Sequence, residues 1–233
     1  MRPNLPENNV KAAFVSQILP YDIRNELTKA GVQCIDVKAA EYITSELKYH
    51  PDIVMLNVEE GVWYTEKSNE QMFVFGELRR LSRDLGNKYP LDCLLNHVVA
   101  GNTVICGKST DIRIFGKEKD IIKVNQAYAK CSTVIVNESA FITSDKSIYK
   151  ALKTNGFDVL LTVNDRIGLN GYSCGFIGGC AGKIAKDTIV FTGNINKHKD
   201  AANIKSFCAN HQTQIISLCD RPLYDYGGIL PII

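Results

Sequence analysis

The chain has 233 residues, of which 45% are apolar and 22% charged, a balance typical of folded proteins and not of disordered or fibrous ones. The formal net charge of +2 gives no reason to expect nucleic acid or an anionic membrane as a partner. The apolar runs are too short to span a membrane and the N-terminal residues lack the apolar core of a signal peptide, so we expect a cytoplasmic protein.

The first elements that the sequence predicts are a strand, a helix and a second strand. Residues 11–17 alternate as a strand does. Residues 21–30 place Ile23 and Leu27 on one helical face, and Gly31 is a typical helix stop. Residues 32–37 then form the return strand.

The middle of the chain is predicted to contain further strand pairs. Residues 52–57 and 61–65 form one pair, and a helix is expected over residues 75–85. The stretch NHVVAGNTVICGK, residues 96–108, forms another pair. The segment after Cys106 has no helical period and is expected to be a loop or a short hairpin.

Two later units are more regular, and each contains two strands, a helix and a return strand. In the first of these units, Ser144 or Asp145 caps the helix and Asn155 with Gly156 ends it. The predicted strands are 125–131, 133–137, 157–162, 179–184, 188–192 and 214–218, and the second helix covers 200–209. The chain ends in a lone strand, residues 228–233.

Three stretches of the chain read alike. Residues 96–108, 125–138 and 179–193 each contain a small-residue strand, a tight polar turn and a Thr followed by a β-branched run. Such recurrence indicates a repeat architecture. If residues 228–233 pair with residues 11–17, five units are counted and the chain ends close a ring without a free sheet edge.

The cysteines and histidines do not form a metal-binding pattern. The chain has eight cysteines and four histidines, but it contains no C-x-x-C pair and the histidines are scattered. A chain of this length and apolar content does not need disulfides. We therefore expect free cysteines, no structural zinc site and no cofactor.

Five ββαβ-type units in a closed ring resemble the pentein fold, also called the guanidino-group modifying enzyme (GME) fold or α/β-propeller. The likeness is clearest at IGGCAGKIAKDTIVFTG, residues 177–193, and the chain looks like an uncharacterised GME-fold family. The resemblance implies one α/β domain over residues 1–233 with five-fold pseudosymmetry. The superfamily contains arginine deiminases, agmatine deiminases, dimethylarginine dimethylaminohydrolases and amidinotransferases, and also a non-catalytic ribosome anti-association factor.

The resemblance implies a set of site residues. Enzymes of this superfamily attack a guanidinium carbon with a Cys thiolate, move protons with a His and hold the cationic substrate with carboxylates. Aligning the units gives Cys180 as the nucleophile and His97 as the acid/base. Three substrate-binding candidates face the central channel of the ring: Asn57, Asn96 and Asn125. Two more, Asp165 and Asp225, lie at one rim of the ring. The implied activity is that of a hydrolase or transferase, and the implied partner is a small guanidino or amidino molecule.

Some residues depart from the enzyme pattern. The last unit ends GGILPII and carries no cysteine, and Cys180 follows Gly178 and Gly179 where the family often has Gly-Gly-Asp. Because the units resemble one another, a second alignment of them is possible. It puts Cys180 at the position of a substrate-binding carboxylate and leaves the chain without a complete set of catalytic residues. The alternative function is a non-catalytic pentein that binds a small molecule or a macromolecular partner through its channel or rim.

Overall fold

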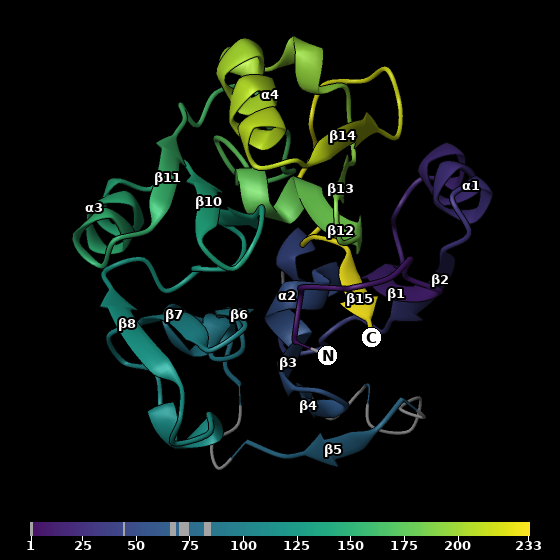
Figure 1. The fold of residues 1–233 in the computed structure, drawn as a ribbon. Helices are drawn as coiled ribbons and strands as arrows, with labels where there is room; N and C mark the ends of the chain where they lie inside the picture. The colour runs from purple at the N-terminus through teal and green to yellow at the C-terminus, as the bar shows by residue number, and fades with distance from the viewer. Residues whose placement is uncertain (1, 44, 66–68, 70–74, 82–84) are drawn as a thin grey trace.

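The computed structural model describes residues 2–43, 45–65, 69, 75–81 and 85–233. The described strands form five three-stranded sheets in a mixed α/β fold. In every sheet the middle strand pairs antiparallel with one neighbour and parallel with the other. Figure 1 shows the sheets following one another around the molecule, with helices α1, α3 and α4 on the outside.

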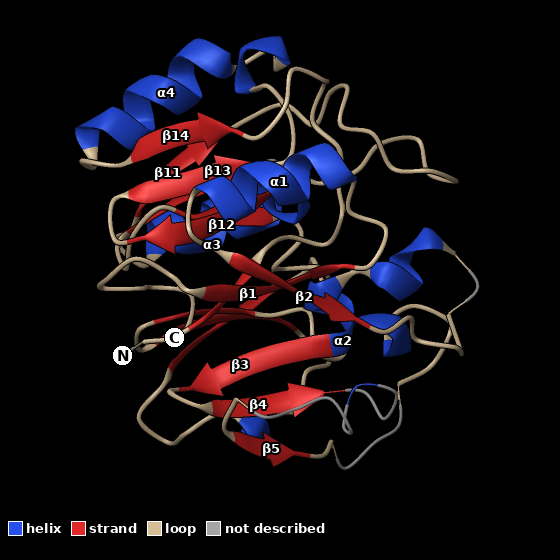
Figure 2. Cartoon of the chain, turned by 90° about the vertical axis from the view of Figure 1, so that its right-hand side faces the viewer, coloured by secondary structure: helices blue, strands red, loops and turns tan. Residues whose placement is uncertain are grey.

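The first sheet joins the two ends of the chain. It consists of β1 (Ala12–Ser16), β2 (Gln33–Val37) and β15 (Leu230–Ile232). The predicted pairing of the chain ends is confirmed, because β1 runs antiparallel to β15 with Ala12 opposite Ile232. The two ends consequently lie side by side in both views (Figures 1 and 2). Helix α1 (Tyr21–Lys29) connects β1 to β2 as predicted.

The second sheet departs from two predictions. It is formed by β3 (Met55–Glu59), β4 (Val62–Thr65) and β5 (Glu77–Arg79), and helix α2 (Pro51–Val54) precedes it. The strand predicted from residue 52 is wrong over 52–54, because Pro51 begins a helical turn there. The helix predicted over 75–85 is wrong at 77–79, because these residues pair with β4 as a strand although their apolar residues are spaced as in a helix. Residues 82–84 of that prediction lie outside the described residues.

The third sheet contains the predicted strand pair and a third strand that was not predicted, and the fourth is shifted along the chain. The third contains β6 (Val98–Ala100), β7 (Thr103–Gly107) and β8 (Asp120–Val124). The fourth contains β9 (Thr133–Ile135), β10 (Ala140–Thr143) and β11 (Asp158–Leu161), with helix α3 (Lys146–Thr154). The predicted strand 125–131 is wrong, because the chain has already used residues 120–124 as a strand beside β7 and then bends. Of the two residues predicted to cap α3, Ser144 and Asp145, it is Asp145 whose side chain accepts from the backbone N–H groups of Ser147 and Ile148.

The fifth sheet has the three predicted strands and the predicted helix, but the first strand begins at Ala181 and not at Gly179, because residues 177–180 form a 3-10 turn. It contains β12 (Ala181–Ala185), β13 (Thr188–Phe191) and β14 (Gln214–Ser217), with helix α4 (Ala201–Asn210) between the last two. Ile204 and Cys208 on α4 are buried against the sheet. All eight cysteines are free. Among the helices within the described ranges, none is long and apolar enough to cross a membrane.

Candidate functional site

The short segments that lead into the first strand of each sheet meet at one place. Five hydrogen bonds link these segments in a circuit: each bond joins one segment to the next, and the fifth returns to the first. Three of the bonds join backbone groups: Asp52 N–H donates to the Gly227 carbonyl (3.2 Å), Gly228 N–H to the Gly179 carbonyl (2.8 Å) and Gly179 N–H to the Cys131 carbonyl (2.9 Å). The Asn96 side chain makes the other two. Its Oδ1 accepts from Cys131 N–H (3.1 Å), and its Nδ2 donates to the Asp52 carbonyl (3.0 Å). This circuit holds a group of polar side chains inside the molecule.

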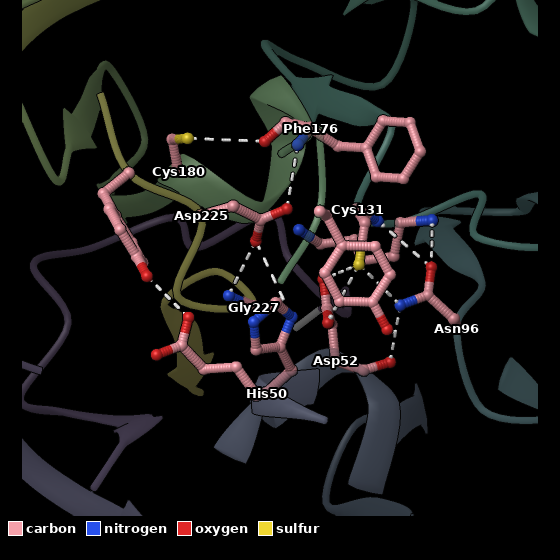
Figure 3. Close-up of polar contacts among 12 residues, drawn as sticks. His50, Asp52, Asn96, Cys131, Phe176, Cys180, Asp225 and Gly227 are labelled. Carbon is pink, nitrogen blue, oxygen red and sulfur yellow. Dashed lines mark hydrogen bonds and ion pairs between the residues drawn. The ribbon is translucent and has the colours of Figure 1, made fainter. Parts of the chain in front are cut away.

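Cys131 lies in this group with a carboxylate and an amide on its thiol (Figure 3). Its Sγ donates to Asp52, at 3.2 Å from Oδ1 and 3.1 Å from Oδ2, and accepts from Asn96 Nδ2 at 3.0 Å. Burial raises the pKa of the Cys131 thiol well above its usual value, and the charges of Asp52 and Asp225 raise it further. A thiol whose pKa is raised in this way is protonated at neutral pH.

Asp52 is the hydrogen-bond partner of this thiol and is itself buried. Burial raises the pKa of the Asp52 carboxyl to about 6, while the nearby charges of His50 and Lys130 act in the opposite direction. A carboxyl with this pKa can exchange a proton near neutral pH, which is a property expected of a reacting group. Lys130 is also buried, with only 7% of its surface exposed.

His50 and Asp225 complete the cluster. The imidazole of His50 is fully buried and neither ring nitrogen has a hydrogen-bond partner. Its Nδ1 lies 3.7 Å from Asp225 Oδ1, and Asp225 is fixed by the backbone N–H groups of Phe176 (2.8 Å) and Gly227 (3.0 Å). Close packing requires glycine at two positions, since a Cβ at Gly179 would lie 1.8 Å from Asp225 Oδ1 and one at Gly227 would lie 2.4 Å from the His50 Cα.

Two small cavities adjoin the cluster. One has a volume of about 10 Å³ and is lined by Asp52, His97 and Lys130 among others. The second has a volume of about 20 Å³ and is lined by Asn4 and Ala181, again with Lys130. Each is about the size of one water molecule. Neither of these cavities has room for a small organic ligand in this conformation.

Two of the site residues predicted from the sequence, Asn96 and Asp225, belong to the cluster. No hydrogen bond joins the predicted pair of Cys180 and His97, two described side chains, and neither ring nitrogen of His97 has a hydrogen-bond partner. Cys180 packs in an apolar core with Ile177, its thiol donates to the Phe176 carbonyl at 3.3 Å, and burial raises its pKa.

His97 and the three other predicted residues make no hydrogen bond to the Cys131 thiol in the described part of the chain, although His97 and Asn57 line the smaller cavity beside Asp52. His97 packs against the Phe115 ring at 5.7 Å, and burial lowers its pKa to about 4. In the amide orientation that satisfies both partners, Asn57 donates to the Glu59 carbonyl (2.8 Å) and accepts from the Trp63 indole (2.9 Å). Asn125 is exposed at the bend after β8, and Asp165 is partly exposed beside Arg166.

Four residues of the cluster were not predicted from the sequence: His50, Asp52, Lys130 and Cys131. Each lies just before the first strand of a sheet, as Asn96 does. That shared position is the signal that identifies them, but the wrong strand at 125–131 placed Cys131 inside a strand.

Comparisons with known proteins give a family and a fold. A sequence profile described as a family of unknown function, DUF6873, matches residues 14–230. No curated protein matches the sequence.

Three solved structures with low sequence identity are similar in fold. An inosamine-phosphate amidinotransferase from Streptomyces griseus has a TM-score of 0.61 at 10% identity, covering 100% of this chain and 97% of that one. A C. jejuni agmatine deiminase has a TM-score of 0.58 at 12% identity, covering 94% and 90%. A dimethylarginine dimethylaminohydrolase from Pseudomonas aeruginosa has a TM-score of 0.51 at 8% identity, covering 90% and 92%.

Proposed function

Because the chain belongs to the DUF6873 family and has the pentein, or guanidino-group modifying enzyme, fold, we propose that it modifies the guanidino or amidino group of a small cationic molecule with Cys131 as the nucleophile. The observation that carries the proposal is the buried Cys131 thiol donating to the Asp52 carboxylate. The named activities of the similar structures, a deiminase and amidinotransferases among them, support this class of substrate.

The charges around Cys131 suit a cationic substrate. Asp52 and Asp225 both raise the pKa of the thiol, so a guanidinium ion bound beside these carboxylates would offset their effect and lower that pKa. The thiol proton passes to Asp52, and the thiolate attacks the amidino carbon. The carbon–nitrogen bond then breaks, and the departing amine takes a proton. Water or an acceptor amine finally displaces the sulfur.

The other cluster residues are assigned to holding and proton transfer. Asn96 fixes the thiol and the two neighbouring backbone segments. His50, whose ring nitrogens are unpartnered, is assigned to pass the proton taken up by Asp52 on to the departing amine. Asp225 would hold the substrate cation. Asn57, Asn125 and Asp165 stay predictions for substrate binding.

The closed architecture is part of the same proposal. We infer a single domain over residues 1–233 in which repeated units form a five-fold propeller. The circuit of hydrogen bonds through Asp52, Asn96, Cys131, Gly179 and Gly227–Gly228 supports this arrangement, since it joins the segments that precede the first strands of all five sheets. A cytoplasmic location stays a prediction.

Two alternatives are retained. The first is the nucleophile expected from the sequence, Cys180 with His97, which is ranked lower because Cys180 is surrounded by apolar side chains. The second is a non-catalytic pentein that binds a small molecule or a macromolecular partner. The water-sized cavities beside the cluster favour it, because access of a substrate to Cys131 requires a change of conformation.

Turnover measurements on matched serine variants test the proposal. The protein is incubated with agmatine, arginine or dimethylarginine, with and without an acceptor amine, and ureido or amidino-transfer products are quantified. We expect turnover that Cys131→Ser abolishes and that Cys208→Ser, a change of another buried cysteine, leaves intact. Turnover that is lost in Cys180→Ser and kept in Cys131→Ser would move the nucleophile to Cys180. Absence of turnover and of thiol adducts favours the non-catalytic function.

A further inference from the structure

The geometry points to a zinc-class metal site formed by His50, Asp52 and Cys131, and this inference does not depend on the proposed reaction. One ligand atom from each residue lies within 4.8 Å of the others. Ligands bound at about 2.0–2.3 Å around a tetrahedral ion lie about 3.5 Å apart. The Sγ of Cys131 is already 3.1 Å from Asp52 Oδ2, so a modest movement of His50 would complete the set.

The second, independent observation is the state of the His50 ring. Both ring nitrogens are buried without a hydrogen-bond partner, whereas buried polar groups are normally bonded. Nδ1 faces Asp225 Oδ1 at 3.7 Å. Once the ring shifts so that Nδ1 donates to Asp225, that carboxylate orients the ring and leaves Nε2 for a metal. Asp225 is held for this role by backbone N–H groups of Phe176 and Gly227.

The chemistry of the ligands selects the ion. A thiolate, an imidazole and a carboxylate are the ligands that Zn²⁺ and its analogue Co²⁺ take, whereas Mg²⁺ and Ca²⁺ prefer oxygen alone. The thiolate of Cys131 and the carboxylate of Asp52 together neutralise a divalent charge in a buried site. The sequence predicted no such site, because His50 and Asp52 lie far along the chain from Cys131. Metal binding and attack by Cys131 exclude each other, so the ion would hold the thiol in an inactive state.

Cobalt and zinc loading of the full chain tests the inference. The protein is stripped with a chelator, loaded with Co²⁺ or Zn²⁺, and freed of excess ion by gel filtration. We expect about one ion per chain and a thiolate-to-cobalt charge-transfer absorption. Cys131→Ser abolishes that absorption, whereas Cys208→Ser, the matched buried cysteine, retains it. His50→Gln lowers the affinity at least about tenfold.

The outcomes separate this inference from the proposed function. An ion that is not retained by the native protein, or that is retained equally by Cys131→Ser, overturns the metal site. Neither result alters turnover by the metal-free protein. The charge-transfer absorption is measured on the native protein, so this part of the test stands even where a variant fails to fold. A charge-transfer band in a protein without turnover supports the site and removes only the reaction.

Discussion

Replacement of Asp52 by asparagine isolates the effect of one buried carboxyl on stability. The asparagine side chain has nearly the same shape and keeps an oxygen that accepts the Cys131 thiol proton, but it carries no charge at any pH. In the native protein, burial raises the pKa of Asp52 from 3.8 to about 6. The folded state therefore binds this proton more tightly than the unfolded state does.

The sign and size of the effect follow from that difference. Because the folded pKa is the higher one, the contribution of Asp52 to stability is fully present below about pH 4 and is lost as the pH rises through about 6. A difference of about two units corresponds to about 3 kcal/mol in the free energy of unfolding. We expect the native protein to lose about this much relative to Asp52→Asn between pH 4 and pH 7.

Urea unfolding of both proteins at several pH values measures the difference directly. Taking the difference cancels most of the contributions of His50, Lys130 and Asp225, because both proteins contain them. A difference that does not change with pH would show that the pKa of Asp52 is not raised. A difference that changes in the opposite direction would show that the charged carboxylate is stabilised, and the reasoning about its burial would be refuted.

Two further predictions concern the packing of the cluster and are read from unfolding curves. Asn96→Ala leaves two buried backbone N–H groups without their acceptor and should lower the free energy of unfolding by about 3 kcal/mol, whereas Asn155→Ala at an exposed helix end should lower it by less than about 1 kcal/mol. Equal effects would contradict the role of the Asn96 amide. Gly179→Ala places a Cβ 1.8 Å from Asp225 Oδ1 and should lower the free energy of unfolding by about 3 kcal/mol or more. Gly31→Ala, with a positive φ and open space, should lower it by about 1–2 kcal/mol, and a tolerated Gly179→Ala would contradict the packing described.

Local sequence signals predicted the outer parts of the fold. Ile23 and Leu27 on one face, with Gly31 beyond, specified α1, and the Asp145 cap specified the start of α3. These signals act within a few residues. The pairing of β1 with β15 was also predicted, because a lone strand at each end of the chain needs a partner.

The central cluster could not be predicted in the same way, because its contacts are distant in sequence. The Cys131 thiol bonds to Asp52, 79 positions away, and to Asn96, 35 positions away. The repeats read almost alike, so a strand placed too early at 125–131 shifted the alignment of the fourth unit. Cys180 then became the natural candidate. Which cysteine has a carboxylate partner depends on packing among five sheets and not on a local pattern.

Alkylation with a charged and a neutral reagent tests the assignment of Cys131 most directly. Chloroacetamidine is a cation and chloroacetamide is neutral, and both alkylate a thiol by displacing chloride. We expect the amidine to modify Cys131 at least about tenfold faster, the factor that corresponds to a thiol pKa lowered by one unit. Mass spectrometry of the digested protein locates the adduct. Equal rates for the two reagents, or an adduct on Cys180 in place of Cys131, would contradict the account.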